Sequence, residues 1–241
     1  MQPSFRFDNQ AVFVLHTYPF KETSLVVELF SHEHGRVATT AKGARRPRSA
    51  MRGMLQSFQP LLATWSGKAE LKTLHSLDWA GGLLLLKGEA LMCGFYLNEL
   101  LLRLLPREDA HEALFVYYSA TLKTLAMEQD LAATLRRFEL KLLQELGYAI
   151  PLQVDSAGSA VLAEQGYVYQ AEHGAQAIGM AHTGQNGVQL SGKTLLDMAG
   201  DDYTQTQTQQ QSKQLMRYLL AHYLGDQPLH TRQLLIDLQG L

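Results

Sequence analysis

Apolar and polar positions alternate in short runs through the first eighty residues, a pattern typical of β-strands. Polar turn residues separate the runs, and Ser66-Gly67 predicts a tight hairpin between the last two. Five such strands with one long interruption after the third predict a small barrel of the OB type, and an SH3-like barrel is the alternative. The predicted strands are Ala11–Tyr18, Thr23–Phe30, Gly35–Lys42, Phe58–Trp65 and Lys68–Leu77.

After residue 80 the spacing of apolar positions changes to about 3.6, which predicts helices. Gly88–Leu105 is apolar nearly all round, as in a helix at the centre of a bundle, and Pro106 ends it. Ala110–Met127 and Leu131–Leu146 are the next predicted helices, and Gly147 stands where a C-terminal cap belongs.

The rest of the chain is less regular. Residues 151–187 are small, polar and rich in glycine, with weak strand patterns at Gly166–Gln170 and Gln176–Met180. Helices are predicted at Ser191–Ala199 with Ser191 as its N-cap, in a segment that ends near Leu224, and at Pro228–Leu238. We therefore predict an α+β protein, with a barrel domain in residues 1–80 and a mostly helical domain in residues 81–241.

Composition excludes several classes of protein. With 46% hydrophobic and 18% charged residues, the chain is globular rather than disordered. Its single cysteine, Cys93, excludes an intramolecular disulfide framework and a multi-cysteine zinc site. The N-terminal residues do not resemble a signal peptide, and charged residues interrupt each long apolar run. We expect a cytoplasmic protein without a membrane span.

Charge is divided unevenly along the chain, whose net charge is -2. Residues 1–80 hold ten Lys/Arg against six Asp/Glu, and residues 81–241 hold eleven against seventeen. Five of the cations fall within eleven residues that contain no acid, and Gly43 and Pro47 predict that this stretch is a loop. The five are Lys42, Arg45, Arg46, Arg48 and Arg52. Because such a cluster repels itself, it indicates a polyanionic partner, and a solvated loop without a partner is the alternative.

Other residues of the first eighty are candidates for the same surface. Lys68 and Lys72 would extend the basic track along one face of the last strand, and Arg36 is a weaker candidate because Glu33 is a possible ion-pair partner. Phe58 and Trp65 are candidates for stacking on exposed bases, although core packing is the stronger interpretation for both.

Catalytic and metal-binding patterns are weak. His32-Glu33-His34 offers two imidazoles without a third ligand nearby, so an exposed turn is the better interpretation. Cys93 lies within an apolar helix, where a thiol is ordinarily inert packing. The chain holds no nucleophile elbow, phosphate-binding glycine loop or zinc-protease motif. We therefore expect neither an enzyme nor a cofactor.

Arg136 and Arg137 lie in the middle of an amphipathic helix. One interpretation places both on a solvated face, paired with Glu139 or Glu145. In the other, an arginine beside apolar Phe138 and Leu142 binds an acidic peptide that ends in a hydrophobic residue, with the cation on the carboxylate.

A set of short strings occurs in order along the chain. They are Phe13-Val-Leu-His-Thr-Tyr-Pro-Phe-Lys-Glu-Thr-Ser-Leu25, Gly35-Arg-Val, Ala41-Lys-Gly-Ala-Arg45, Leu55-Gln-Ser-Phe-Gln-Pro-Leu-Leu62, Glu70-Leu-Lys-Thr-Leu74, Tyr96-Leu-Asn-Glu-Leu-Leu101, Leu135-Arg-Arg-Phe-Glu-Leu140 and Leu146-Gly-Tyr148. Together these strings resemble the RecO family of bacterial recombination mediators. The resemblance covers about residues 11–150 and resumes weakly from Tyr223-Leu-Gly to Leu229-His-Thr-Arg-Gln-Leu.

The resemblance implies an OB fold followed by a helical domain. It also implies binding of single- and double-stranded DNA, annealing of complementary strands, and help to RecR in loading RecA onto strands coated by single-stranded-DNA-binding protein (SSB). Many members of the family hold a four-cysteine zinc site, but residues 151–185 of this chain contain no cysteine, so no zinc is expected. Similar zinc-less members bind the acidic SSB tail on the helical domain, and the string around Arg136 matches that region.

We therefore expect a non-enzymatic DNA-repair protein, associated with the nucleoid, whose barrel binds phosphates through the eight basic residues named above. Two other classes stay open. An RNA-binding OB protein shares the same barrel chemistry and is separated from it by competition between DNA and RNA strands. A hydrolase that uses scattered His or Asp residues would show turnover in a nuclease screen.

Overall fold

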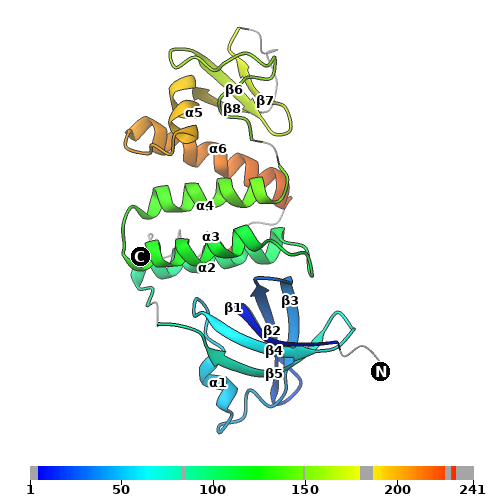
Figure 1. The fold of residues 1–241 in the computed structure, drawn as a ribbon. Helices are drawn as coiled ribbons and strands as arrows, with labels where there is room; N and C mark the ends of the chain where they lie inside the picture. The colour runs from blue at the N-terminus through cyan, green and yellow to red at the C-terminus, as the bar shows by residue number, and fades with distance from the viewer. Residues whose placement is uncertain (1–4, 83–84, 149, 180–186, 226–228, 232–241) are drawn as a thin grey trace. The chain divides into compact units, whose positions relative to one another are not determined.

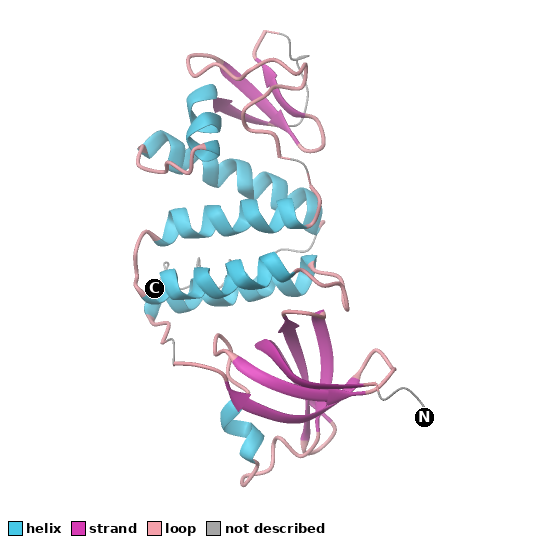
Figure 2. Ribbon diagram, in the orientation of Figure 1, coloured by secondary structure: helices cyan, strands magenta, loops and turns pink. Residues whose placement is uncertain are grey.

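A computed structural model of the protein describes residues 5–82, 85–148, 150–179, 187–225 and 229–231. The chain forms two compact units, which Figures 1 and 2 show as ribbons. Unit 1 comprises residues 1–129 and 229–241, and unit 2 comprises residues 130–228. No helix among the described residues is both long enough and apolar enough to span a membrane.

Unit 1 begins with a closed five-stranded barrel in the order β1-β2-β3-β5-β4. β3 and β5 run parallel, whereas the other neighbouring strands are antiparallel. This small barrel confirms the predicted OB fold. Its elements are β1 (Arg6–Phe20), β2 (Ser24–Ser31), β3 (Gly35–Ala41), the short helix α1 (Ala50–Met54), β4 (Leu61–Ser66) and β5 (Lys72–Trp79).

Alternate residues of the strands fill the barrel. Val27 and Leu29 of β2, Val37 of β3 and Trp65 of β4 belong to one buried cluster. Successive side chains of a strand point to opposite faces, so the apolar positions of the sequence pattern meet inside the barrel. Burial of each aliphatic side chain contributes about 1.5–3 kcal/mol to the stability of the folded state. Trp65 is fully buried, which confirms that it belongs to the core.

The connection between β4 and β5 differs from the predicted two-residue hairpin. Ser66 pairs with Thr73, so the connection is a longer loop and β5 begins at Lys72 rather than at residue 68. Ion pairs explain the difference: Glu70 binds Arg107, and Lys72 binds Glu108. These contacts hold the connection against the segment after the first long helix instead of in the sheet ladder.

Two helices complete the described core of unit 1, α2 (Gly88–Leu104) and α3 (Glu112–Ala126), both close to their predicted ranges. The Asn98 amide donates to the carbonyl oxygen of Leu15 at 2.9 Å, and the Tyr118 hydroxyl donates to the Asn98 side-chain oxygen at 2.5 Å. Phe13 and Phe30 of the barrel pack against Phe115 of α3, each with ring centroids 5.3 Å apart. Apolar packing and a buried polar chain therefore join the helices to the barrel.

The described residues of unit 2 form three helices and a small sheet in the order β7-β6-β8. The predicted N-cap is present, because the Ser191 hydroxyl accepts from the backbone N–H of Thr194, and Gly225 ends the helix that was predicted to finish near Leu224. The strand expected at Gln176–Met180 runs instead from Gly174 to Ala177, because Gly174 turns the chain back onto its partner strand with a φ of +78°, and Met180 lies outside the described residues. The elements are α4 (Leu131–Glu145), β6 (Gly166–Gln170), β7 (Gly174–Ala177), β8 (Val188–Ser191), α5 (Gly192–Ala199) and α6 (Thr206–Leu224).

The strand β8 was not predicted, because a pattern of four residues is too short to stand out from the irregular segment before it. The helix predicted at Pro228–Leu238 lies outside the described residues except for 229–231, of which His230 and Thr231 are helical.

Candidate nucleic-acid interface

The basic loop, residues 42–52, leaves the barrel at the end of β3 and returns through α1. Gly43 adopts a φ of +70°, a conformation that favours glycine, and Ala44 then inserts fully buried into the barrel core. The backbone N–H of Arg46 donates to the carbonyl of Gly43, and that of Ser49 to the carbonyl of Arg46, each at 3.0 Å. The loop therefore has a defined path.

Arg52 lies on the short helix α1 rather than on the predicted irregular loop. Gly43 and Pro47 break regular structure only in the first part of the segment. Beyond them, Met51 and Met54 pack against the barrel core, and this apolar anchor allows one helical turn to form.

All five cations of the basic loop are exposed. Within the part of the chain that the structure describes, no carboxylate lies within ion-pair distance of any of them. The structure therefore confirms that these five cations are accessible and that no described carboxylate neutralises them. Such a surface attracts anions with regularly spaced charges, of which the phosphates of a nucleic acid are one kind.

The turn between β1 and β2 adjoins the basic loop. The backbone N–H of Arg45 donates to the carbonyl of Thr23 at 2.9 Å, and its guanidinium donates to the carbonyl of Lys21 at 3.4 Å. These bonds place exposed Lys21 beside the cluster, more than twenty residues away in sequence. Sequence reasoning missed Lys21, since only the barrel fold brings the two turns together.

The other three predicted basic residues differ from the loop. Lys72 is buried, and its ammonium group donates to Glu108 at 2.5 Å and to the carbonyl of Ala69 at 3.2 Å. Lys68 is exposed, but it lies in the β4–β5 connection with its ammonium 4.1 Å from the centre of the Phe5 ring. The two lysines therefore do not share the strand face that the sequence pattern predicted.

Arg36 lies close to Glu28, with 3.8 Å between its guanidinium and the carboxylate, and not to Glu33 as the sequence suggested. Burial lowers the pKa of Arg36, and Glu28 opposes this effect. Arg107, from the segment after α2, binds both Glu28 and Glu70. Burial acts to lower the pKa of Arg107, but these two carboxylates raise it overall.

These residues form two groups of ion pairs, Arg36–Glu28–Arg107–Glu70 and Lys72–Glu108, which we together call the ion network and which hold equal numbers of opposite charges. Its cations are Arg36, Lys72 and Arg107, and its anions are Glu28, Glu70 and Glu108. The backbone supports the network, because Gly35 leaves so little room beside the Asp109 carbonyl that a Cβ atom would lie 1.8 Å from its oxygen. The network therefore fixes the segment after α2 to the barrel, while unopposed charge is concentrated on the basic loop.

The remaining candidates of unit 1 occupy structural positions. Phe58 and Trp65 are buried and present no face to a ligand. His32 and His34 lie in the turn after β2, where their rings contact Phe115 and Trp65, respectively. Among the described residues, no group of three or more His, Cys, Asp and Glu is placed to hold a metal ion. Cys93 is buried in α2.

The two arginines of α4 in unit 2 have different environments. The Arg136 guanidinium donates at 2.5 Å to Glu139, whose side chain is almost fully buried. The Arg137 guanidinium donates at 2.6 Å to Asp201, which is 67% exposed, and lies 5.2 Å from the Tyr203 ring centre. Burial acts to lower the pKa of Arg137, and Asp201 raises it overall. Arg137 is thus the more accessible of the two.

Phe138 and Leu142, the apolar partners predicted for a peptide groove, are fully buried. The 3.6-residue period places them on the inner face of α4, so their side chains do not line an open surface beside the arginines. Any peptide contact of α4 in this structure would therefore rest on the arginines and their polar surroundings.

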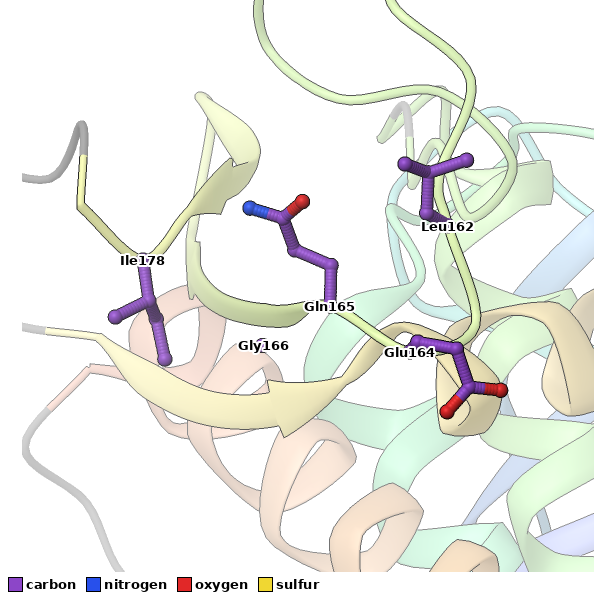
Figure 3. Close-up of a pocket in the computed structure, with 5 residues that line it drawn as sticks. All are labelled: Leu162, Glu164, Gln165, Gly166 and Ile178. Carbon is purple, nitrogen blue, oxygen red and sulfur yellow. The ribbon is translucent and has the colours of Figure 1, made fainter.

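A shallow hollow of about 420 Å³ lies elsewhere in unit 2, beside β6 (Figure 3). Its lining is Leu162, Glu164, Gln165, Gly166 and Ile178. It offers one carboxylate and no cation, so it does not resemble a site for phosphate.

A small OB barrel that carries an exposed basic loop is typical of nucleic-acid-binding proteins. Two family models match the chain: "Recombination protein O N terminal" over residues 6–83 and "Recombination protein O C terminal" over residues 85–233. The chain therefore belongs to the RecO family, as its sequence strings indicated.

Curated relatives agree with this assignment. The protein named "DNA repair protein RecO" of Nitrosospira multiformis is 54% identical over 237 residues, 98% of each chain. The protein of that name from Aromatoleum aromaticum is 55% identical, and the match covers 98% of both chains. The one from Thiobacillus denitrificans is 52% identical, and the match covers 100% of this chain and 96% of the relative. The chain is a DNA repair protein of the RecO family.

Proposed function

We propose that this protein is a non-enzymatic mediator of recombinational repair that acts at the nucleoid in the cytoplasm. In this role it binds single- and double-stranded DNA, anneals complementary strands, and helps RecR to load RecA onto strands coated by SSB. The observation that supports the proposal is the basic loop, whose five exposed cations have no carboxylate partner among the described residues.

DNA binding follows from the electrostatics of the loop. Cations that no acid neutralises release condensed counterions when they contact phosphates, and this release supplies sequence-independent affinity. Annealing follows from the same contacts, because two strands of like charge repel each other less once protein cations neutralise their phosphates. No covalent bond changes in either process, so the role needs no catalytic group.

Recruitment to SSB-coated strands is assigned to α4 in unit 2. The proposed ligand is the acidic C-terminal tail of SSB, and Arg137 is its proposed cationic contact. In the structure, Arg137 is ion-paired with Asp201. Because Asp201 is exposed, a peptide carboxylate can take its place on Arg137. Arg136 is bound to a buried acid, so we assign it to holding α4 rather than to the peptide.

The test of DNA binding is reversal of charge at Arg45, Arg46 and Arg48. The triple Glu variant is expected to lose at least tenfold in affinity for single strands and duplex alike, and to anneal complementary strands more slowly. A matched control reverses three exposed cations of unit 2, Lys193, Lys213 and Arg217, and is expected to keep DNA affinity.

Unchanged DNA binding and annealing in the loop variant would refute the assignment. A competition arm with RNA strands of equal length tests the alternative class, since a marked preference for RNA would point to an RNA-binding role instead.

A further inference from the structure

Three aromatic residues follow one side of β1 next to the basic loop. His16, Tyr18 and Phe20 occupy alternate positions of the strand, so their side chains point to the same face. Thr17, between the first two, pairs with Val27, whose side chain belongs to the barrel core. The aromatic residues therefore face outward, and we call them the aromatic stripe.

The aromatic stripe is accessible. The Tyr18 side chain is 45% exposed, and exposed His16 lies beside it with 4.5 Å between the ring centroids. Phe20 is half-buried, and the ammonium group of Lys21 lies 5.3 Å from the centre of its ring. A single exposed aromatic residue is ordinary on a protein surface, but a row of them beside concentrated positive charge is not.

Hydrogen bonds connect the stripe to the basic loop. Arg45 donates to the carbonyl oxygens of Lys21 and Thr23, in the turn that directly follows Phe20. Tyr18 precedes Lys21 by three residues, so their backbones are at most about 10 Å apart. The aromatic stripe and the basic loop therefore adjoin at this turn, within reach of a short stretch of polynucleotide.

The chemistry of this surface distinguishes between nucleic acids. The bases of a duplex already stack on one another, whereas an unpaired base has a free π-face that can stack on an aromatic side chain. Cations attract both kinds of DNA through their phosphates, so positive charge alone does not favour a single strand. An apolar peptide would gain nothing from the surrounding positive charge, so the charge favours a polyanion with exposed rings.

We infer that Tyr18, with His16 beside it, stacks on unpaired bases of a strand whose phosphates contact the basic loop. The inference rests on the proposed function and adds to it a preference for single strands over duplex.

The test compares Tyr18→Ala, Tyr18→Phe and wild-type full-length protein by fluorescence anisotropy. The probes are an oligothymidylate and a duplex of equal length, each measured across a salt series. Loss of one stacked base is expected to weaken single-strand binding about 5- to 140-fold. Duplex affinity and the salt slope are expected to stay unchanged, because stacking neutralises no phosphate. Tyr18→Phe keeps the ring and is expected to bind like the wild type.

Val116→Ala is the control, since it removes an exposed apolar side chain from α3 rather than from a barrel strand. Single-strand binding that survives Tyr18→Ala would overturn the inference, as would an equal loss on duplex. Either result leaves the proposed function intact as long as the triple loop variant still loses both DNA types. Unchanged DNA binding by the triple loop variant would instead refute the proposed function.

Discussion

The number of phosphate contacts that we propose for the basic loop can be measured through the salt dependence of DNA binding. On a single strand, each neutralised phosphate contributes about -0.7 to the slope of log K against log salt concentration. The five cations of the loop therefore predict a slope of about -3.5, and the variant Arg45→Gln/Arg46→Gln/Arg48→Gln, with two cations left, predicts about -1.4.

The two slopes differ enough to separate in one experiment. Between 50 and 200 mM salt, the wild type is expected to lose about 130-fold in affinity and the triple variant only about 7-fold. Anisotropy titrations of an unstructured oligonucleotide measure both. The control Lys193→Gln/Lys213→Gln/Arg217→Gln removes the same charge from unit 2 and is expected to keep the wild-type slope. Equal slopes for the wild type and the loop variant would show that the phosphates bind elsewhere.

Three further predictions concern both units. Asn98→Ala removes two buried hydrogen bonds, from Asn98 to Leu15 and from Tyr118 to Asn98, and is expected to lower the free energy of unfolding by about 2–5 kcal/mol in a denaturant titration. A loss below 1 kcal/mol would contradict this reasoning. Burial alone would raise the pKa of Glu99, but hydrogen bonds from Thr231 and His230 lower it overall, so this contact stabilises the protein above the ordinary pKa of 4.5 and is lost as pH falls further. Glu99→Gln is expected to flatten the acid side of a plot of melting temperature against pH, and an unchanged profile would argue against the contact. Arg137→Ala is expected to weaken binding of an acidic, Phe-terminated peptide in calorimetry while DNA binding persists, and unchanged peptide binding would exclude this arginine.

Periodic patterns predicted much of the fold, because those patterns have local causes. The alternation of Val, Leu and Phe in the first eighty residues located the five strands, and the 3.6-residue spacing located α2, α3 and α4 within two residues at their ends. Gly43 and Pro47 placed the basic loop for the same reason, since their backbone preferences act within a few residues.

The same reasoning could not predict contacts between residues that are far apart in sequence. Lys72 resembles an exposed strand cation in sequence, yet it binds Glu108, 36 residues later. Phe138 and Leu142 resemble a groove beside two arginines, but a helical period shows only that they share a face and not whether that face is open. In each case the partner is supplied by tertiary packing, which local spacing does not encode.

A net charge of -2 does not exclude the polyanion binding that we propose, because the charge is unevenly distributed over the molecule. Screening limits each surface charge to a range of about 8–10 Å, so affinity depends on the local balance and not on the total. In unit 1, Arg36, Lys72 and Arg107 are balanced by three carboxylates and hold the segment after α2 to the barrel. The basic loop has no such partners among the described residues, and Arg45 ties it to the turn that carries Lys21. Structural cations and cations available to a ligand thus occupy separate parts of one small unit, and only the second group should set the salt slope.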